Sequence, residues 1–321
     1  MMVMGALVLW PGVANALPDP IAWWTFNDGS NQTTEQIHGL ISTLSSNNGT
    51  TGPGFVAESI LPDVDCNRSA LSFDGVDDYV SVPDPGGPVA YDGLAQLSLS
   101  AWVRAEGDTG GVVVSKYDTH NAWLSWFLSL NTGRQVRFAI GGAGGHDRTN
   151  EVYQGVDGPT IPAGQWVHLT GVWTGGVGAA SFHLFIDGVE VQTTFLTNQT
   201  FTGMYQGSVP IEIGAIHSAT GSFVGRSSFF RGLIDDVRVY DAALSSDDVA
   251  ILATGGGSID ACDQCPIVCL PEPSERVFYG VVRRGSDGSL GSVQCWTAGD
   301  AIECRRDVSG ELLVGEPMCG D

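Results

Sequence analysis

Hydrophobic and polar residues alternate along most of the chain, in short segments that turn-forming residues separate. Alternation with a period of two is typical of β-strands that bury one face. About a dozen such segments follow one another, and Gly, Asp, Asn or Pro usually stands between them. The pattern predicts an all-β fold of about a dozen antiparallel strands, arranged as a β-sandwich or jelly roll.

Three local signals add detail to this prediction. The pair Asp187-Gly188, between two alternating segments, predicts a tight hairpin. Residues 27–54 are rich in Ser, Thr, Asn and Gly, which predicts mostly loop. One short helix is expected at residues 245–253, because Ser245 and Asp248 form a capping-box pattern at its start.

A carboxylate interrupts the apolar face of the last strand of this series. In residues 232–240, simple alternation places Asp235 on the core side together with Leu233, Val237 and Val239. An unpaired buried carboxylate costs several kcal/mol. We therefore expect Asp235 to meet an arginine, a metal ion or a group of backbone N–H donors.

The charge of the chain limits its partners. There are 36 acidic and 14 basic residues, which gives a formal net charge of −22, and Lys116 is the only lysine. Such a surface repels phosphate backbones, so no nucleic-acid binding is expected. It favours cations, neutral glycans or basic surfaces, although high solubility alone also explains the charge.

The chain divides into four parts by composition. Residues 1–16 are apolar and end in Ala14-Asn15-Ala16, which predicts a signal peptide; a buried first strand is the alternative. The jelly roll occupies residues 17–254, and a Gly-rich linker occupies residues 255–260. No apolar run is long enough for a membrane span.

The last part, residues 261–321, is rich in cysteine and is expected to be a small β-domain of two or three strands. Disulfides are the expected role of its cysteines, since a zinc site would normally need a second CxxC pair or a His pair, and this part has one CxxC pair and no histidine. The pairing stays open, and Cys66 is left over. The six cysteines of this part are Cys262, Cys265, Cys269, Cys295, Cys304 and Cys319.

Seven motifs, in this order along the chain, resemble the laminin-G-like jelly-roll family of the concanavalin A-like lectin/glucanase superfamily. Each motif alone is ordinary β-sheet sequence, but the series covers residues from about 20 to 254. The motifs are WWTFNDGS at 23–30, ALSFDGVDDYVSV at 70–82, LSLSAWVRAE at 97–106, VVVSKYD at 112–118, QWVHLTGVWTG at 165–175, HLFIDGVEV at 183–191 and GLIDDVRVYDAALSSDDVAIL at 232–252.

The resemblance implies a function and a metal site. Members of the family recognise glycan or protein ligands outside the cell, so we expect a secreted recognition module. An inward carboxylate near the last strand often binds a structural calcium ion in such modules. By this resemblance Asp235 would bind calcium together with Asp78 and with Asp28 or the neighbouring Asn27.

The chain also resembles the related pentraxins, which bind ligands through calcium held by two acidic loops. The first of these loops corresponds to residues 117–121, where Tyr117, Asp118, His120 and Asn121 are candidate ligand-binding residues. Trp123 follows closely and could stack on a sugar ring. The second loop corresponds to residues 216–219 and contains no carboxylate, which argues against a pentraxin-type double-calcium site.

Motifs for catalysis are missing from the sequence. Glucanases of this fold need closely spaced acids on one face of a strand, as in an E-x-D-x-x-E run, and no such run occurs. There is also no GxSxG or HExxH motif. We therefore expect a non-enzymatic module that binds glycan or extracellular protein; a structural or adhesion spacer is the alternative, and the oligomeric state stays open.

Overall fold

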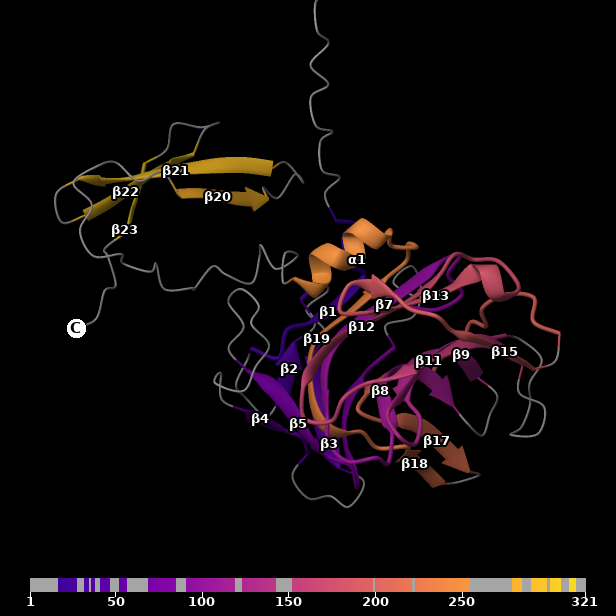
Figure 1. Ribbon diagram of the computed structural model, residues 1–321. Helices are drawn as coiled ribbons and strands as arrows, with labels where there is room; N and C mark the ends of the chain where they lie inside the picture. The colour runs from indigo at the N-terminus through magenta and orange to yellow at the C-terminus, as the bar shows by residue number, and fades with distance from the viewer. Residues whose placement is uncertain are drawn as a thin grey trace, which may run out of the picture.

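The computed structural model describes residues 17–27, 32–34, 36–37, 41–46, 52–56, 69–84, 91–118, 123–142, 152–198, 200–220, 223–254, 279–284, 290–298, 301–306 and 312–315. Its main body is a sandwich of two sheets (Figure 1). The predicted all-β fold is therefore confirmed. The described residues contain no helix that is both long and apolar enough to span a membrane.

The first sheet, here called sheet A, has the strand order β14-β13-β12-β7-β19-β5-β4, and β1 pairs with β19 beside β5. Its neighbouring strands are antiparallel. The bounds are β1 (Ala22–Trp24), β4 (Gly54–Val56), β5 (Ala70–Asp74), β7 (Leu97–Ala105), β12 (Trp166–Trp173), β13 (Phe182–Ile186), β14 (Val189–Glu190) and β19 (Arg231–Tyr240).

Sheet B has the order β15-β11-β10-β9-β8-β16-β6-β3-β2, and a hairpin of β17 and β18 attaches to β8. The bounds are β2 (Gln32–Thr34), β3 (Ile41–Ser46), β6 (Asp78–Val82), β8 (Gly111–Asp118), β9 (Trp123–Leu130), β10 (Gln135–Gly141), β11 (Tyr153–Thr160), β15 (Thr194–Asn198), β16 (Ile211–Ile213), β17 (Ile216–Thr220) and β18 (Phe223–Ser227).

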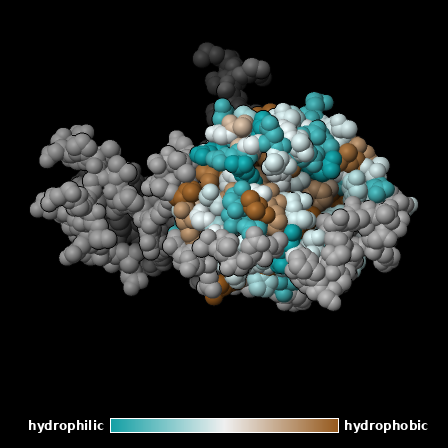
Figure 2. Space-filling model, turned by 90° about the horizontal axis from the view of Figure 1, so that it is seen from below, coloured by the Kyte–Doolittle hydropathy of each residue, from teal (hydrophilic) through white to brown (hydrophobic). Residues whose placement is uncertain are grey.

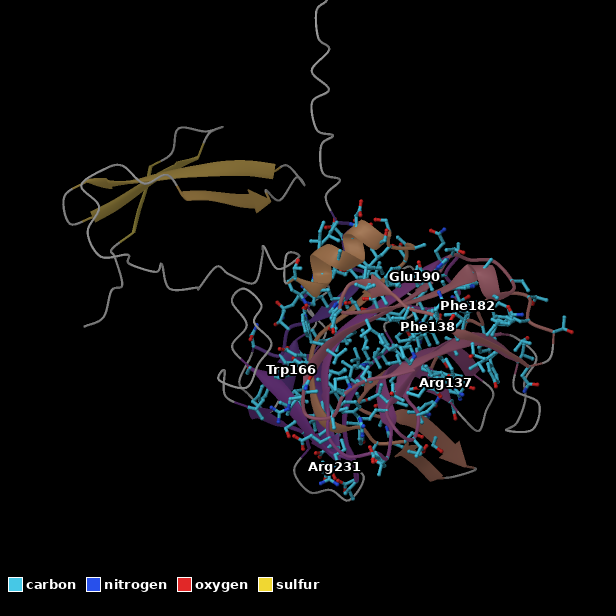
Figure 3. The ribbon with its side chains drawn as sticks, viewed as in Figure 1. Arg137, Phe138, Trp166, Phe182, Glu190 and Arg231 are labelled. Carbon is cyan, nitrogen blue, oxygen red and sulfur yellow. The ribbon has the colours of Figure 1, made fainter. Side chains whose placement is uncertain are left out.

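Apolar side chains of both sheets meet in one continuous core. Val103 and Ile234 come from sheet A, and Leu128 and Phe138 come from sheet B. Phe138 and Phe182 lie in the interior between the sheets, with ring centroids 6.1 Å apart (Figure 3). The core therefore forms largely as the alternation predicts. The exceptions are β8, which contributes the adjacent residues Val113 and Val114, and β19, where the core residues are Ile234 and then Val237.

Helix α1 (Ser246–Ala253) covers part of the outer face of sheet A. Ser245 caps the helix: its side chain accepts a hydrogen bond from the Asp248 backbone, and the Asp248 side chain accepts one from the Ser245 backbone. The predicted helix and its capping box are confirmed. A short 3₁₀ turn (Ala179–Ser181) precedes β13.

Of the local predictions, the hairpin turn is confirmed, whereas two segments expected to be loops contain strands. Asp187 and Gly188 both have positive φ, 50° and 79°, as a tight hairpin turn requires, so this turn is confirmed. Residues 27–54 were expected to be mostly loop, but they contain β2 and β3. Residues 216–219 were compared with a loop, but they lie in the β17–β18 hairpin.

The C-terminal part contains a separate sheet of four antiparallel strands, in the order β20-β21-β22-β23. The bounds are β20 (Tyr279–Arg284), β21 (Leu290–Ala298), β22 (Ala301–Arg306) and β23 (Leu312–Gly315). Two or three strands were expected, and β23 is the additional one. The predicted signal peptide and linker lie outside the described residues.

Candidate functional site

Strand β8 carries two of the residues that the sequence suggested for ligand binding. It pairs with β9 so that Val114 and Lys116 lie opposite the core residues Leu128 and Trp126. Lys116 therefore points into the sandwich, and the next residue, Tyr117, points outward.

Lys116 is fully buried and compensated by two carboxylates. Its Nζ donates to the carbonyl of Val209 at 2.6 Å and lies 3.3 Å from Asp84 and 3.2 Å from Asp92. Asp92 in turn accepts a hydrogen bond from the Gly207 backbone. The alternation of β8 could have located this lysine in the core, but its partners come from distant segments.

Tyr117 is buried beneath the β17–β18 hairpin. Its ring packs edge-on against Phe127, with centroids 5.2 Å apart, and shares a small apolar cluster with Val112 and Ile216. The prediction that Tyr117 contacts ligand from a loop is therefore wrong for its ring. The reason is that β17 runs alongside β8 and covers this end of the strand.

Asp118 is also buried, and it faces a histidine of the same hairpin. His217 pairs with Asp118 between β17 and β8, and its Nδ1 lies 3.5 Å from Asp118 Oδ2. This distance gives an electrostatic contact that is longer than a good hydrogen bond. The His217 side chain keeps 11% of its surface exposed, whereas that of Asp118 has none.

Glu212 on β16 adds a second buried carboxylate to this region. One of its oxygens, Oε1, accepts hydrogen bonds from Arg226 at 2.6 Å and from Ser81 at 3.2 Å. The Arg226 guanidinium also stacks over the Tyr79 ring, 4.5 Å from its centroid. Burial raises the pKa of Glu212, and the charges of Arg226 and His217 oppose this rise.

Together these residues form a charge cluster at the hairpin, which consists of Asp118, Glu212, His217 and Arg226. Glu212 Oε2 and His217 Nδ1 have no hydrogen-bond partner among the described residues. Sequence reasoning selected only Asp118 from this cluster. The alternation in residues 211–213 marks Glu212 as a residue of the opposite face from the core, which was the available signal.

The other ligand-binding candidates follow Asp118 directly. His120 and Asn121 lie outside the described residues, and of Trp123 only the backbone is described, opposite Asp118 in the ladder of β8 and β9. The structure thus places the start of the predicted segment beside the charge cluster.

The metal candidates do not gather as predicted. Asp28 lies outside the described part of the chain, and Asp78 groups with Asp74 and Asp77 instead of with Asp235. The ligand oxygens of this acidic turn lie within 4.8 Å of one another. Burial, and then the charges of the two neighbouring acids, raise the pKa of Asp78 to about 6.

The acidic turn has a well-defined backbone. Asp74 Oδ1 accepts hydrogen bonds from the backbone of Val76 and Asp77, and Asp78 Oδ2 accepts one from the backbone of Asp74. Gly75 has a φ of 78°, and a Cβ there would lie 2.6 Å from the Cβ of Arg231. The turn therefore requires glycine at this position.

Asp235 does not point toward the core, so the face predicted for it is wrong. A β-bulge between Asp235 and Arg238, with Asp236 at a φ of 47°, shifts the alternation of β19 by one residue. Ile234, Val237 and Val239 are the core residues. Asp235 is buried on the outer face, beside Trp102, and it accepts a hydrogen bond from the Asp236 backbone at 2.8 Å.

Further polar groups lie on this outer face of sheet A; His168 is fully buried and Asp236 is partly buried. The carboxylate of Asp236 binds Trp23 Nε1 at 2.5 Å and Arg238 Nε at 3.0 Å. His168 lies 2.9 Å from the Ser100 hydroxyl. Burial lowers the pKa of His168 to about 4, so this histidine is neutral near pH 7.

The cysteines of the C-terminal part are described only in part. Cys295 lies in β21 and Cys304 lies in β22. Cys66, Cys262, Cys265, Cys269 and Cys319 lie outside the described residues.

Comparisons with known proteins place the sandwich in a family. Residues 74–250 match the model of the concanavalin A-like lectin/glucanases superfamily. The comparison with curated proteins gave no match.

Solved structures with a similar fold share little sequence with the chain. The binding domain of botulinum neurotoxin serotype G has 10% identity and a TM-score of 0.50 over 92% of this chain and 74% of that one. Domain 4 of an extracellular arabinanase from Geobacillus stearothermophilus, in complex with arabinotriose, has 20% identity and a TM-score of 0.49 over 74% and 99%.

A SAP-like pentraxin from Limulus polyphemus is a third similar structure, with 17% identity and a TM-score of 0.39 over 59% of this chain and 83% of the pentraxin. At sequence identities of 20% or less, structural similarity shows a shared fold and does not show a shared function. The family match, by contrast, covers more than half of the chain. The protein therefore belongs to the concanavalin A-like lectin/glucanase superfamily.

Proposed function

We propose that the sandwich is a non-catalytic recognition module that binds carbohydrate or protein ligands at the cell exterior. Membership of the superfamily supports this proposal. The observation that carries it is that four buried carboxylates are already engaged within the protein: Asp92 faces Lys116, Asp118 faces His217, Glu212 faces Arg226, and Asp235 accepts a backbone hydrogen bond.

Hydrolysis of a glycosidic bond requires a different arrangement. Two carboxyl groups must face each other across the scissile bond, one as the acid and one as the nucleophile or base. Glu212 is instead held by Arg226 at 2.6 Å, and Asp118 lies against His217. Because these carboxylates already interact with basic side chains, they are not arranged as an acid and a nucleophile. This arrangement favours recognition over catalysis.

We place the ligand site at the charge cluster and the segment that follows Asp118. Glu212 and Arg226 supply opposite charges there, and His120, Asn121 and Trp123, which follow Asp118 in the sequence, are residue types that supply hydrogen bonds and a stacking surface. His217 is the member of the Asp118–His217 pair that reaches the surface.

The charge of the module favours neutral or cationic ligands. Within the described sandwich, each Lys and Arg except the exposed Arg231 has an acidic partner within 4 Å. Little positive charge remains for a sulfated or phosphorylated ligand. The pairs are Arg104–Glu106, Lys116 with Asp84 and Asp92, Arg134–Asp108, Arg137–Asp157, Arg226–Glu212 and Arg238–Asp236.

The surface supports a polar mode of recognition. On the face in Figure 2, apolar residues form several separate patches with polar residues between them. A hydrophobic docking interface would need a larger continuous patch. In the described part of the chain the exposed large apolar residues are Ile37, Ile41, Val76, Val177 and Val189.

Export is the second component of this proposal. The apolar stretch that ends in Ala14-Asn15-Ala16 and the cysteine-rich C-terminal part both fit passage into an oxidising compartment. Sequencing the N-terminus of protein collected from the culture medium or the cell envelope tests it. We expect a mature chain that starts near Leu17; an intact Met1 on cell-interior protein would contradict export.

A glycan array tests the recognition function. The full chain is applied to neutral, amino-bearing, sialylated and sulfated glycans, with and without calcium. We expect binding among the neutral or amino-bearing glycans. Measurable self-association with an empty array would favour the spacer function, and release of free sugar from a bound glycan would reveal an enzyme.

Two matched histidine variants locate the site. His217→Ala removes the side chain that faces Asp118, and we expect at least a tenfold weaker binding of the ligand that the array identifies. His183→Ala is the control, because His183 also faces a carboxylate, Glu190 at 2.7 Å, but on sheet A. Equal effects of both variants would remove the site from the hairpin.

We also propose that the acidic turn of Asp74, Asp77 and Asp78 holds a structural calcium ion. Calcium prefers carboxylate and backbone oxygens, which this turn concentrates. One oxygen each of Asp74 and Asp78 is occupied by backbone N–H groups, and the second oxygen of each and the Asp77 carboxylate face no hydrogen-bond donor among the described residues. The donor set therefore fits a cation.

Thermal unfolding in chelator and in calcium tests this site. We expect a higher Tm in calcium, and we expect Asp77→Asn to abolish the difference. Asp241→Asn, at an exposed acid outside the turn, is the control and should retain it. A Tm that calcium leaves unchanged would refute the metal site without affecting the recognition proposal.

A further inference from the structure

The C-terminal sheet places two cysteines directly opposite each other. β21 and β22 are antiparallel, and their register pairs Cys295 with Cys304. Pairing continues on both sides, from Val293 opposite Arg306 to Ala298 opposite Ala301. The two cysteines thus lie inside a continuous ladder.

This register meets the geometric requirement for a disulfide. Residues that lie opposite each other in an antiparallel pair share a face of the sheet, with Cα atoms about 4.5 to 5.5 Å apart. Disulfides join residues whose Cα atoms lie about 4.4 to 6.8 Å apart. A shift of one residue would place the two cysteines on opposite faces, so their pairing depends on this register.

We infer that Cys295 and Cys304 form a cross-strand disulfide. The small size of the C-terminal part explains why such a bond would be needed. A domain of about sixty residues has a small hydrophobic core, and disulfides commonly stabilise such domains. A zinc site is the competing use of the two thiols, but such a site would normally need a second CxxC pair or a His pair, and the C-terminal part has one CxxC pair and no histidine.

The bond reduces the number of possible pairings among the remaining cysteines. Six cysteines allow fifteen connectivities and four allow three. With the cross-strand bond in place, the three connectivities within the C-terminal part concern Cys262, Cys265, Cys269 and Cys319, and Cys66 is a fifth cysteine that any of these four can still meet.

Formation of the bond requires an oxidant of the disulfide class, such as oxidised glutathione or a disulfide-carrying oxidoreductase. The thiolate of one cysteine attacks the oxidant's disulfide and releases one thiol. The second cysteine then attacks the mixed disulfide and displaces the other thiol. The chain loses two protons and two electrons, and the oxidant gains them as two thiols.

The arginines of the chain make this bond easy to test. Trypsin cleaves after Arg284 and after Arg305, and the peptide between them, residues 285–305, contains Cys295 and Cys304 and no other cysteine. Cys262, Cys265 and Cys269 fall in residues 239–276, and Cys319 falls in residues 307–321. A bond from Cys295 or Cys304 to any other cysteine therefore gives a crosslinked mass that differs from the mass of the single peptide 285–305.

The full wild-type chain is folded in a glutathione redox buffer, treated with iodoacetamide, and digested without reduction. We expect the peptide of residues 285–305 to be unalkylated and two hydrogen atoms lighter than its dithiol form. After reduction it should accept two alkyl groups. Cys319→Ser is the control and should give the same peptide.

Two other results would overturn the inference. The first is a crosslink from residues 285–305 to any of the other cysteine peptides, including the one that ends at Arg68 and contains Cys66. The second is a peptide with both cysteines alkylated, which together with bound zinc in the untreated protein would identify a thiolate metal site. Because wild-type protein is mapped, the result does not depend on whether a variant folds.

Discussion

Single buried charges in the sandwich differ in what compensates them. Glu212 depends on Arg226 alone for a full countercharge, whereas Lys116 has Asp84 and Asp92. A buried ion that loses its partner is costly because the protein interior screens charge poorly. Removing a partner of Glu212 or Lys116 should therefore lower the free energy of unfolding.

Arg226→Ala should destabilise the sandwich by about 3 to 5 kcal/mol, because Glu212 would remain buried without a countercharge. Arg104→Ala is the matched control, since Arg104 and Glu106 form a partly exposed pair whose loss costs less than about 1 kcal/mol. Urea unfolding measures both values. Similar losses in the two variants would show that Glu212 is not dependent on Arg226.

Asp78 should make the domain more stable at acidic pH than at neutral pH. Its pKa is about 6 in the folded chain and near its ordinary value of 3.8 in the unfolded chain. Since the folded state holds the proton more tightly, this contribution is complete below about pH 4 and is lost as the pH rises to about 6.

The variant Asp78→Asn removes the charge and keeps an oxygen for the Asp74 N–H group. In chelator at pH 7 we expect it to be more stable than the wild type by about 1 to 2 kcal/mol, with no gain near pH 4. Unfolding free energies at the two pH values measure the effect. A gain that is equal at both would contradict the raised pKa.

His168 should have the opposite effect and make the domain less stable at acidic pH than at neutral pH. Its pKa is about 4 when folded against 6.5 ordinarily, so the unfolded chain takes up a proton first as the pH falls. The stability it contributes is present above about pH 6.5 and is lost as the pH falls toward 4.

His168→Gln has no such titration and can still bond to Ser100. We expect the wild type to lose about 2 to 3 kcal/mol more than this variant between pH 7 and pH 4. Parallel pH profiles of the two proteins would show that His168 becomes charged without unfolding.

The elements show how far the sequence alone can predict this molecule. The hairpin turn at Asp187-Gly188 and the cap of α1 rest on local geometry, so the residues themselves predict them. The strands of the sandwich follow from period-two alternation. Local chemistry thus accounts for the fold class and for most of the core.

What could not be predicted depends on contacts between distant segments. One extra residue in β19 turns Asp235 to the other face, and no residue type announces a bulge at that position. Likewise, the packing of β17 over Tyr117 is set by a pairing of residues about one hundred positions apart. The candidate site was therefore located to the right strand but only partly to the right residues.

The cap of α1 offers a prediction at the level of one element. Ser245→Ala removes the acceptor for the Asp248 N–H group and should cost about 1 kcal/mol. Ser246→Ala, one position into the helix, leaves the cap intact and should cost much less. Thermal unfolding compares the two, and an equal shift in Tm would mean that the cap does not stabilise the domain.

For the molecule as a whole, the position of Lys116 has a consequence for chemical labelling. The chain has one ε-amine, and it lies between the two sheets with an exposed fraction of zero. Amine-reactive reagents should therefore spare the ε-amine of the folded protein and modify it only when the sandwich opens.

The labelling rate of Lys116 would then report the opening of the core directly. With an excess of a fast reagent, we expect it to follow the global unfolding rate and to increase with denaturant along the unfolding limb. Peptide mapping separates this site from the α-amine. Rapid labelling of Lys116 in native buffer would show that the core opens locally; a protected lysine would make this chain, without any engineered probe, its own sensor of unfolding.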